Sequence, residues 1–571
     1  MVPRAIRPLW MSCSFLIKKG MMKMTNKDLA DLIFKDLKIT HDDCLKRYPK
    51  RDLPEGAVVT RYAPSPTGFV HMGNVYAAFI ERKMAKQSNG IFYLRIEDTD
   101  QKRYVKDGIQ RIIKDMKDFN IEFDECPLNE TDEVGNYGPY IQSQRKDIYQ
   151  AFVKYFVENG LAYPCFCTEH DLSEMREHQM AIKDRLGYYG KYAKCRDLSI
   201  EEAYKRIESG ESYVIRFKSH GDYNKKIIVN DLVKGKIEFP QNDKDEVILK
   251  STDGLPTYHF AHLVDDVLMG TTHVIRDQNW LPSTPLHIEL FNAYGVKPLK
   301  YAHISPVNKK EGDSIRKLSK RKDPEAAVSY YHEMGIPVNA AMIYVATIAN
   351  SNFEAWYDCN KDKTLDDFEL TFSKISKSGP LFDVEKLNSI SKEYISRMKA
   401  IEVYTDLLRW ANEFDIDFAN LITKYKDYTI SILNIEREQK KPRKDFSCYS
   451  EIKSYIWYMY DELFNNVSYE WQNISDVVEI KKILNTYIDK YYDANDDKET
   501  WFNKMKELCN ELGFASDMKA YKENPENYKG SIVDISMVVR VALTTKSMTP
   551  DLYEIMKLLG TERIKNRIGL L

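Results

Sequence analysis

The chain has 571 residues, 43% of them hydrophobic, and a formal net charge of −2. This length accommodates three or four domains and excludes a single small binding module. The nearly neutral charge gives no bulk argument for nucleic-acid binding, so any RNA contact must be local. No apolar run approaches the roughly 20 residues that span a bilayer. The nine cysteines lack the density of a disulfide scaffold, so we expect a reducing, cytoplasmic location and no membrane partner.

The N-terminal extension, residues 1–55, begins with an unusual basic segment. Residues 1–27 contain six basic residues and no acidic one, around a short apolar stretch at 8–17. Two interpretations are open: a targeting segment, or a translation start placed too early, since Met21, Met22 and Met24 follow at once. The second is favoured because the stretch is short and has no clear small-residue cleavage site.

The next region predicts a strand, a glycine-containing loop and a helix. Residues 56–61 (GAVVTR) form a β-branched run, and residues 63–74 (APSPTGFVHMGN) are dense in proline and glycine. Apolar residues then repeat at helical spacing up to Ser88, followed by a predicted strand at 91–97 and a predicted helix at 106–120. This βαβα order predicts a parallel sheet with ligands at the carboxyl ends of its strands.

The loop before the first of these helices is a candidate phosphate-binding site. Backbone N–H groups and the positive end of a helix dipole suit a polyphosphate. His71 lies two residues before Gly73, where an imidazole can donate to phosphate oxygens. The loop contains neither the dinucleotide fingerprint nor a P-loop, so taken alone it is weak evidence, and an ordinary turn histidine is the alternative.

Three short motifs occur in a characteristic order. Residues 61–74 (RYAPSPTGFVHMGN) are followed by 95–100 (RIEDTD) and, far downstream, by 317–321 (KLSKR). The first resembles the HIGH motif of class I aminoacyl-tRNA synthetases with Asn74 as its last residue, the second matches glutamyl and glutaminyl enzymes, and the third resembles the KMSKS loop. From about residue 58 onward the chain resembles the bacterial glutamyl-tRNA synthetases.

The resemblance implies a Rossmann-like, parallel-sheet α/β catalytic domain with an inserted acceptor-binding domain, followed by an all-α anticodon-binding region. The catalytic halves are expected at 56–162 and 247–330, and the inserted domain at 163–246. A region that contacts the tRNA stem is expected at 331–380. Residues 381–571 are predicted to form amphipathic helices, for example at 467–492 and 550–571, which distinguishes a full synthetase from truncated relatives.

The resemblance also implies ATP-dependent activation of L-glutamate and transfer of the glutamyl group to the 3′ end of tRNA. Catalysis then depends on positioning and on stabilising charge at phosphate oxygens. We expect His71, Lys317 and Lys320 to be catalytic, with Lys320 neutralising the leaving pyrophosphate and Mg²⁺ bridging phosphate oxygens. A solvated basic loop is the alternative for the lysines. The other implied ATP contacts are Pro64, Thr67, Gly68, Gly73, Asn74, Asn279, Val307 and Ser319.

An amino acid with two carboxylates requires cationic partners. Arg61, at the end of the first predicted strand, and Arg276, in a predicted strand at 273–277 (HVIRD), are suited to this role. Within the implied pocket, Glu97 suits the ammonium group and Tyr258 a carboxylate. By resemblance the glutamate pocket comprises Arg61, Ala63, Ser65, Glu97, Tyr258, His262 and Arg276.

Two positions depart from the family pattern. The family often has Asn at the position of His262, and often has Gly or Ala followed by acids where this chain has residues 277–279 (DQN). These departures affect the details of amino-acid and ATP contacts rather than the class of enzyme.

Three cysteines of the inserted region are candidate zinc ligands: Cys165, Cys167 and Cys195. A fourth ligand such as Asp197 or Tyr192 would complete a tetrahedral structural site. Buried reduced thiols are the favoured alternative, because the spacing is not a standard C-x2-C knuckle.

The expected partners are L-glutamate and tRNA(Glu), and we expect the protein to be a monomer. Two alternatives remain open at this point. One is a relaxed enzyme that also glutamylates tRNA(Gln), and the other is a catalytically silent RNA-binding homologue.

Overall fold

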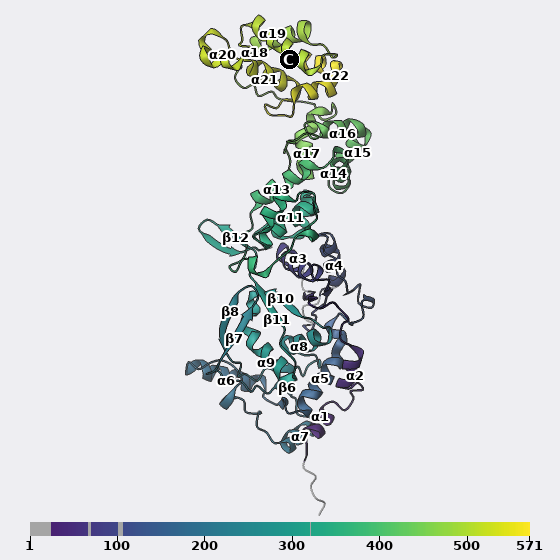
Figure 1. Ribbon diagram of the computed structural model, residues 1–571, viewed down its shortest axis with the longest axis vertical. Helices are drawn as coiled ribbons and strands as arrows, with labels where there is room; N and C mark the ends of the chain where they lie inside the picture. Colours follow the sequence, from purple (N-terminus) through teal and green to yellow (C-terminus); the bar gives the residue numbers. More distant parts are fainter. Residues whose placement is uncertain (1–23, 67–69, 101–104, 106, 320) are drawn as a thin grey trace, which may run out of the picture. The chain divides into compact units, whose positions relative to one another are not determined.

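The computed structural model describes residues 24–66, 70–100, 105, 107–319 and 321–571. The basic segment at 1–23 and the expected site residues Thr67, Gly68 and Lys320 therefore lie outside the described residues. The chain forms two compact units, whose elements are labelled in Figure 1. The described residues of the first unit are 24–66, 88–100, 105, 107–109 and 123–303, and those of the second are 70–87, 110–122, 304–319 and 321–571.

Two short helices open the described part of the first unit, α1 (Asn26–Ile33) and α2 (His41–Arg47). Each begins with a capping box in which a threonine and an aspartate three residues later satisfy each other's backbone N–H groups. Both helices pack against α5 (Lys146–Glu158), and Phe34 and Tyr48 belong to the same buried core as Phe152. Residues 24–48 are therefore an integral part of this unit.

A parallel sheet forms the centre of the first unit. Strand β1 (Val59–Tyr62) pairs in parallel with β2 (Ile91–Leu94), as predicted. Beyond β2 the ladder continues, since the Arg95 N–H donates to the Tyr62 carbonyl at 3.0 Å. On its other side β1 lies next to β10 (His273–Asp277), which pairs with β11 (Lys300–Ile304). Arg61 and Arg276 both lie within these strands, and Glu97 follows β2.

Three helices of this unit carry or contact expected site residues, and all three follow the inserted region in the chain. They are α8 (Tyr258–Leu268), the 3-10 helix η4 (Gln278–Ser283) and α9 (Thr284–Tyr294), and α8 packs against α9. None of the described helices combines the length and the apolar character that a membrane crossing needs.

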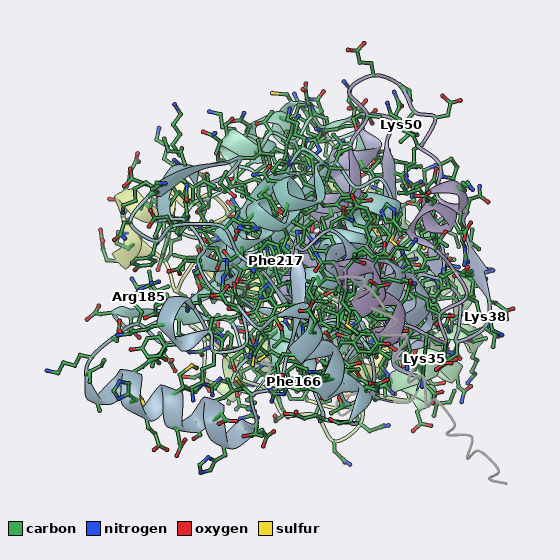
Figure 2. The ribbon with its side chains drawn as sticks, turned by 90° about the horizontal axis from the view of Figure 1, so that it is seen from below. Lys35, Lys38, Lys50, Phe166, Arg185 and Phe217 are labelled. Atoms are coloured by element: carbon green, nitrogen blue, oxygen red, sulfur yellow. The ribbon has the colours of Figure 1, made fainter. Side chains whose placement is uncertain are left out.

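The inserted region contains a small antiparallel sheet and a hairpin. The sheet has the order β5 (Ala162–Cys165), β6 (Val214–Phe217) and β9 (Val247–Leu249), and Phe217 is buried in it (Figure 2). Helices α6 (Glu169–Ala181) and α7 (Ile200–Glu208) lie between its strands in the chain. The hairpin is β7 (Lys226–Asp231) with β8 (Gly235–Pro240).

Strand β9 begins at the predicted boundary between residues 246 and 247, and it pairs with β6 of the inserted region. The run at 247–250 (VILK) is short, apolar and β-branched, so the sequence identified a strand but did not reveal its pairing partner.

The second unit begins with α3 (Met72–Lys86), which packs against α11 (Val338–Ala349). Helix α4 (Gly108–Lys117) starts in the first unit and ends here. A hairpin, β12 (Asn308–Glu311) with β13 (Ser314–Lys317), precedes the KLSKR loop. The helices that follow are α10 (Val328–Met334), α12 (Phe353–Cys359) and α13 (Val384–Arg397).

All the regular elements between residues 400 and 571 are helices, as predicted. The α-helices among them are α14 (Ala400–Phe414), α15 (Ile416–Lys424), α16 (Lys426–Asn434), α17 (Tyr449–Ile456), α18 (Val477–Thr486), α19 (Lys498–Leu512), α20 (Met518–Glu523), α21 (Ile532–Thr544) and α22 (Leu552–Gly569). The helix predicted at 467–492 begins only at Val477, because Asp476 caps α18. Helix α22 is kinked at Gly560, whose φ is 74°.

Candidate active site

His71 caps the N-terminal end of α3, where the helix dipole is positive. Its Nδ1 accepts the N–H of Asn74 at 3.1 Å, and Asn74 Oδ1 accepts the N–H of His71 at 3.1 Å. Because Nδ1 is an acceptor, the proton of the neutral ring lies on Nε2, which is then a donor. Asn74 therefore fixes the orientation and the tautomer of the imidazole.

Gly73 lies directly against this imidazole. A Cβ atom at residue 73 would come within 2.9 Å of His71 Cε1 and 3.0 Å of His71 Nδ1. Ordinary carbon–carbon contacts are about 3.5–4.0 Å, so any larger residue displaces the ring or the helix. The glycine is required by the position of His71.

Asp323 anchors the KLSKR loop of the second unit. Its carboxylate accepts two hydrogen bonds from Arg316, at 2.6 and 2.8 Å, and one from the N–H of Ser319 at 2.8 Å. The hydrogen bonds from Arg316 lower the pKa of Asp323, against its burial. Lys317 ends β13, and the N–H of the next residue donates to the buried Val307 at 3.0 Å. These bonds fix the start of the loop, and sequence reasoning missed Asp323.

In the first unit, buried cations and acids meet where β1 and β2 end. Arg95 donates to Asp266 Oδ1 at 2.7 Å and to Glu97 Oε1 at 2.9 Å. Arg61 Nε lies 3.4 Å from the same oxygen of Asp266. Burial raises the pKa of Asp266, but Arg95 and Arg61 outweigh this and hold it well below its ordinary value. Burial also raises the pKa of Glu97, and the nearby Arg95 and then Arg61 offset only part of this increase. Arg61 and Arg95 are thus balanced by acids.

Arg276 has a different environment, although it too is buried, with 7% of its surface exposed. Its Nε donates to His303 Nε2 at 2.9 Å, and its Nη1 lies 3.1 Å from His287 Nδ1. Its Nη2 donates to Thr284 Oγ1 at 3.2 Å. Among the described residues, Arg276 forms no ion pair. Its guanidinium is therefore a desolvated cation held only by uncharged groups.

Tyr258 lies close to these charged groups. The pKa of Tyr258 is raised, mainly by burial and further by the nearby Glu97, whereas Arg276 and Arg61 act to lower it. Its ring stacks on Trp280 with centroids 4.0 Å apart. The structure therefore brings Arg61, Glu97, Tyr258 and Arg276 into one electrostatic environment.

His262 belongs to the same cluster, but its ring nitrogens are occupied. Nδ1 lies 2.5 Å from Asp266 Oδ2 and Nε2 lies 3.0 Å from the Tyr301 hydroxyl. Burial lowers the pKa of His262 to about 4, although Asp266 opposes this change. The neutral ring therefore donates from Nδ1 and accepts at Nε2. A polar contact from His262 to a substrate would require breaking one of these bonds.

The remaining expected contacts are less enclosed. Ala63 and Pro64 are half-buried after β1, and the Pro64 carbonyl accepts the N–H of Glu97 at 2.9 Å. Ser65 is exposed. Asn279 is exposed in η4, and its N–H donates to Asp277 at 2.9 Å.

Five buried residues of the first unit that contact the expected site residues were not identified from the sequence: Arg95, Asp266, His287, Tyr301 and His303. Arg95 belongs to the RIEDTD motif, but the motif does not reveal its partners. Asp266, which Arg95 contacts, lies 171 residues away in the sequence.

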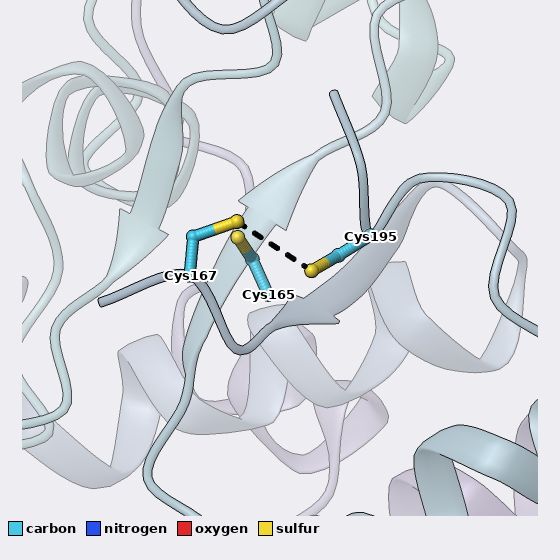
Figure 3. Close-up of side chains that lie close together, drawn as sticks. All are labelled: Cys165, Cys167 and Cys195. Atoms are coloured by element: carbon cyan, nitrogen blue, oxygen red, sulfur yellow. Dashed lines mark hydrogen bonds between the residues drawn. The ribbon is translucent and has the colours of Figure 1, made fainter. Parts of the chain in front are cut away.

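The three cysteines of the inserted region lie together (Figure 3). Their sulfur atoms are all within 4.8 Å of one another, and Cys167 Sγ lies 3.7 Å from Cys195 Sγ. The Tyr188 hydroxyl lies 3.4 Å from Cys165 Sγ and from Cys167 Sγ. All described cysteines are free thiols.

Neither fourth ligand expected from the sequence is at this cluster. Asp197 is 88% exposed and faces Lys218, and the Tyr192 hydroxyl donates to Asp184. The turns between residues 184 and 198 bring Tyr188 to the sulfur atoms instead.

Comparison with known proteins gives consistent matches over most of the chain. Residues 57–389 match the family described as tRNA synthetases class I (E and Q), catalytic domain, and residues 443–570 match the anticodon binding domain. The glutamate–tRNA ligase of Clostridium perfringens is 50% identical over 95% of this chain and 100% of its own length. That of Acetivibrio thermocellus is 45% identical over 95% of this chain and 99% of its own.

A solved structure shows a similar fold. The glutamate tRNA ligase from Elizabethkingia meningosepticum, crystallised in complex with its amino acid, has a TM-score of 0.71 and 27% sequence identity. The match covers 90% of this chain and 98% of that one.

Proposed function

This chain belongs to the glutamate–tRNA ligase family of class I tRNA synthetases, and we propose that it activates L-glutamate with ATP and transfers the glutamyl group to the 3′ end of tRNA(Glu). The supporting observation is Arg276. A buried guanidinium whose hydrogen bonds go only to uncharged groups is costly unless an anion joins it. A carboxylate of bound glutamate supplies that anion and can accept two hydrogen bonds from the planar guanidinium.

In this proposal the pocket selects glutamate by charge. Arg276 and Arg61 face the carboxylates, Glu97 faces the ammonium group, and the Tyr258 hydroxyl donates to a carboxylate. Glutamine is rejected because its neutral side-chain amide would leave the arginine that faces the side-chain carboxylate buried without that counterion. Ala63 and Ser65 border the pocket, and His262 holds Asp266 and Tyr301 in place.

Activation proceeds by attack of a glutamate carboxylate oxygen on the α-phosphorus of ATP, with pyrophosphate leaving. The Nε2–H of His71 donates to phosphate oxygens, and Gly73 and Asn74 keep the ring in position. Lys317 and Lys320 neutralise the leaving pyrophosphate, and Mg²⁺, if bound there, supplies further positive charge. Contacts of ATP with Pro64, Thr67, Gly68, Asn279, Val307 and Ser319 stay predictions.

We propose that the tRNA contacts three regions of the chain. The inserted region holds the acceptor end, residues 331–380 contact the stem, and the C-terminal helices bind the anticodon arm. Phosphate contacts make this affinity fall steeply with salt. A monomeric state and a cytoplasmic location stay predictions.

We further propose a structural Zn²⁺ at Cys165, Cys167 and Cys195. Zn–S bonds of about 2.3 Å in a tetrahedron place sulfur atoms about 3.8 Å apart, and the distance from Cys167 Sγ to Cys195 Sγ is 3.7 Å. The Tyr188 oxygen is placed to be the fourth ligand. The ion would stabilise the inserted region and takes no part in the reaction. A cluster of reduced thiols is the alternative, which metal analysis distinguishes.

The proposed function is tested by glutamate-dependent release of AMP and pyrophosphate in the presence of tRNA. We expect release with glutamate and at least about a hundredfold less with glutamine, since the difference is a buried charge without its partner. A silent RNA-binding homologue would bind tRNA and release neither product. tRNA must be present, because the enzymes that this chain resembles often need it for activation.

A further inference from the structure

The partners of Arg276 form a chain of hydrogen bonds that reaches the inserted region. Arg276 Nε donates to His303 Nε2 at 2.9 Å, and His303 Nδ1 lies 2.6 Å from Asp231 Oδ2. All three side chains are buried. Asp231 ends β7, so one imidazole ring separates Arg276 from a carboxylate of the β7–β8 hairpin.

The direction of these hydrogen bonds is determined by chemistry. The Nε of an arginine only donates, so His303 Nε2 must be the acceptor and the ring proton must lie on Nδ1. That proton is donated to Asp231, which as a carboxylate only accepts. The opposite tautomer of His303 would present an N–H to the N–H of Arg276. Asp231 therefore selects the one tautomer that can hold the guanidinium.

The hairpin turn is fixed against β11, which carries His303 (Figure 1). Asp231 Oδ2 accepts the backbone N–H of His303 at 3.0 Å, and the Leu232 N–H donates to the Tyr301 carbonyl at 2.9 Å. Within the turn, Asp231 Oδ1 accepts the N–H of Lys234 at 2.7 Å. The carboxylate therefore cannot turn away from His303 without losing backbone bonds as well.

We propose that Asp231 and His303 are positioning residues for Arg276: the carboxylate from the β7–β8 hairpin sets the His303 tautomer, and the imidazole holds the guanidinium plane ready for glutamate. This inference rests on the proposed function. It gives the inserted region a part in amino-acid binding in addition to its proposed part in holding tRNA.

The test is steady-state charging of tRNA by the full-length protein, with glutamate and ATP varied separately. Asp231→Asn keeps the shape, but its amide can donate to His303 Nδ1 and so favours the opposite tautomer. We expect the KM for glutamate to rise by about 10–100-fold, with kcat and the KM for ATP within about threefold, because binding to Arg276 is weakened uniformly. The control Asp118→Asn, at an exposed pair with Lys114, should leave all three constants within about twofold.

A double variant separates positioning from general damage. The amide of His303→Gln has no tautomers, so Asp231→Asn should add less than about threefold to the KM for glutamate in that background. The proposal would be overturned if Asp231→Asn raised the KM for glutamate by the same factor in the wild type and in His303→Gln. It would also be overturned if Asp231→Asn alone left this KM unchanged. If Asp231→Asn does not fold, His303→Gln is compared with His303→Met, which offers no oxygen acceptor to Arg276. Equal glutamate KM values in those two would also overturn it. Wild-type protein that fails to charge tRNA with glutamate would refute the proposed function instead.

Discussion

Replacing Gly73 by alanine tests the phosphate-binding geometry with one added methyl group. The new Cβ would lie 2.9 Å from His71 Cε1. Restoring an ordinary contact of about 3.6 Å requires a movement of roughly 0.7 Å in the ring or in the start of α3. Such a movement also stretches the 3.1 Å bond between His71 Nδ1 and the N–H of Asn74. Misplacement on this scale costs about a hundredfold in rate, or about 2.7 kcal/mol.

The stability of Gly73→Ala should change little. Alanine gains up to about 1 kcal/mol of helix propensity over glycine, and a weakened cap loses about 1 kcal/mol. The assay is glutamate-dependent pyrophosphate release with tRNA present, with thermal unfolding measured in parallel. Gly569→Ala in α22 is the control, because its added Cβ would have no atom of the described residues within 4 Å apart from its chain neighbours and the nearby backbone of its own helix. Activity of Gly73→Ala within about threefold of wild type would refute this account of His71.

Three further predictions follow from the first unit. Arg276→Gln should lower kcat/KM for glutamate by about a hundredfold or more, through loss of a charged hydrogen bond worth about 3 kcal/mol. An equally large fall in kcat/KM for ATP would contradict the assignment of Arg276 to glutamate binding. Because the pKa of His262 is lowered to about 4 from 6.5, the unfolded state binds more protons between these pH values, so stability decreases as the pH is lowered through this range. Guanidinium unfolding should show a loss of stability from pH 7 to pH 5 that is about 2 kcal/mol larger in the wild type than in His262→Asn; equal losses would count against it. Cys195→Ser should abolish stoichiometric zinc measured by mass spectrometry, and a zinc-free wild type would instead support reduced thiols.

Local patterns predicted the elements that carry the site. The β-branched run before the proline-rich loop gave β1, and helical spacing after His71 gave α3, because strand and helix periods are visible over a few residues. Helix ends were less accurate. The helix predicted from residue 467 starts at Val477, since periodicity does not show that Asp476 caps it.

Contacts between distant segments could not be predicted. Asp231 and His303 are 72 residues apart, and no local pattern indicates that a hairpin aspartate lies against a strand of another sheet. The pairing of β9 with β6 was missed for the same reason. The choice of Tyr188 over Tyr192 beside the cysteines depends on the turns between them. The resemblance supplied Arg61 and Arg276, whereas the uncharged surroundings of Arg276 came only from the structure.

The central claim is that the chain attaches glutamate to tRNA, and charging assays test it most directly. Purified tRNA(Glu) and tRNA(Gln) are each incubated with ATP and the protein, once with labelled glutamate and once with labelled glutamine. We predict glutamate on tRNA(Glu), and no glutamine on either tRNA. Glutamate on both tRNAs would identify the relaxed form of the same activity. Charging with glutamine, or no charging of tRNA(Glu) with glutamate, would contradict the account.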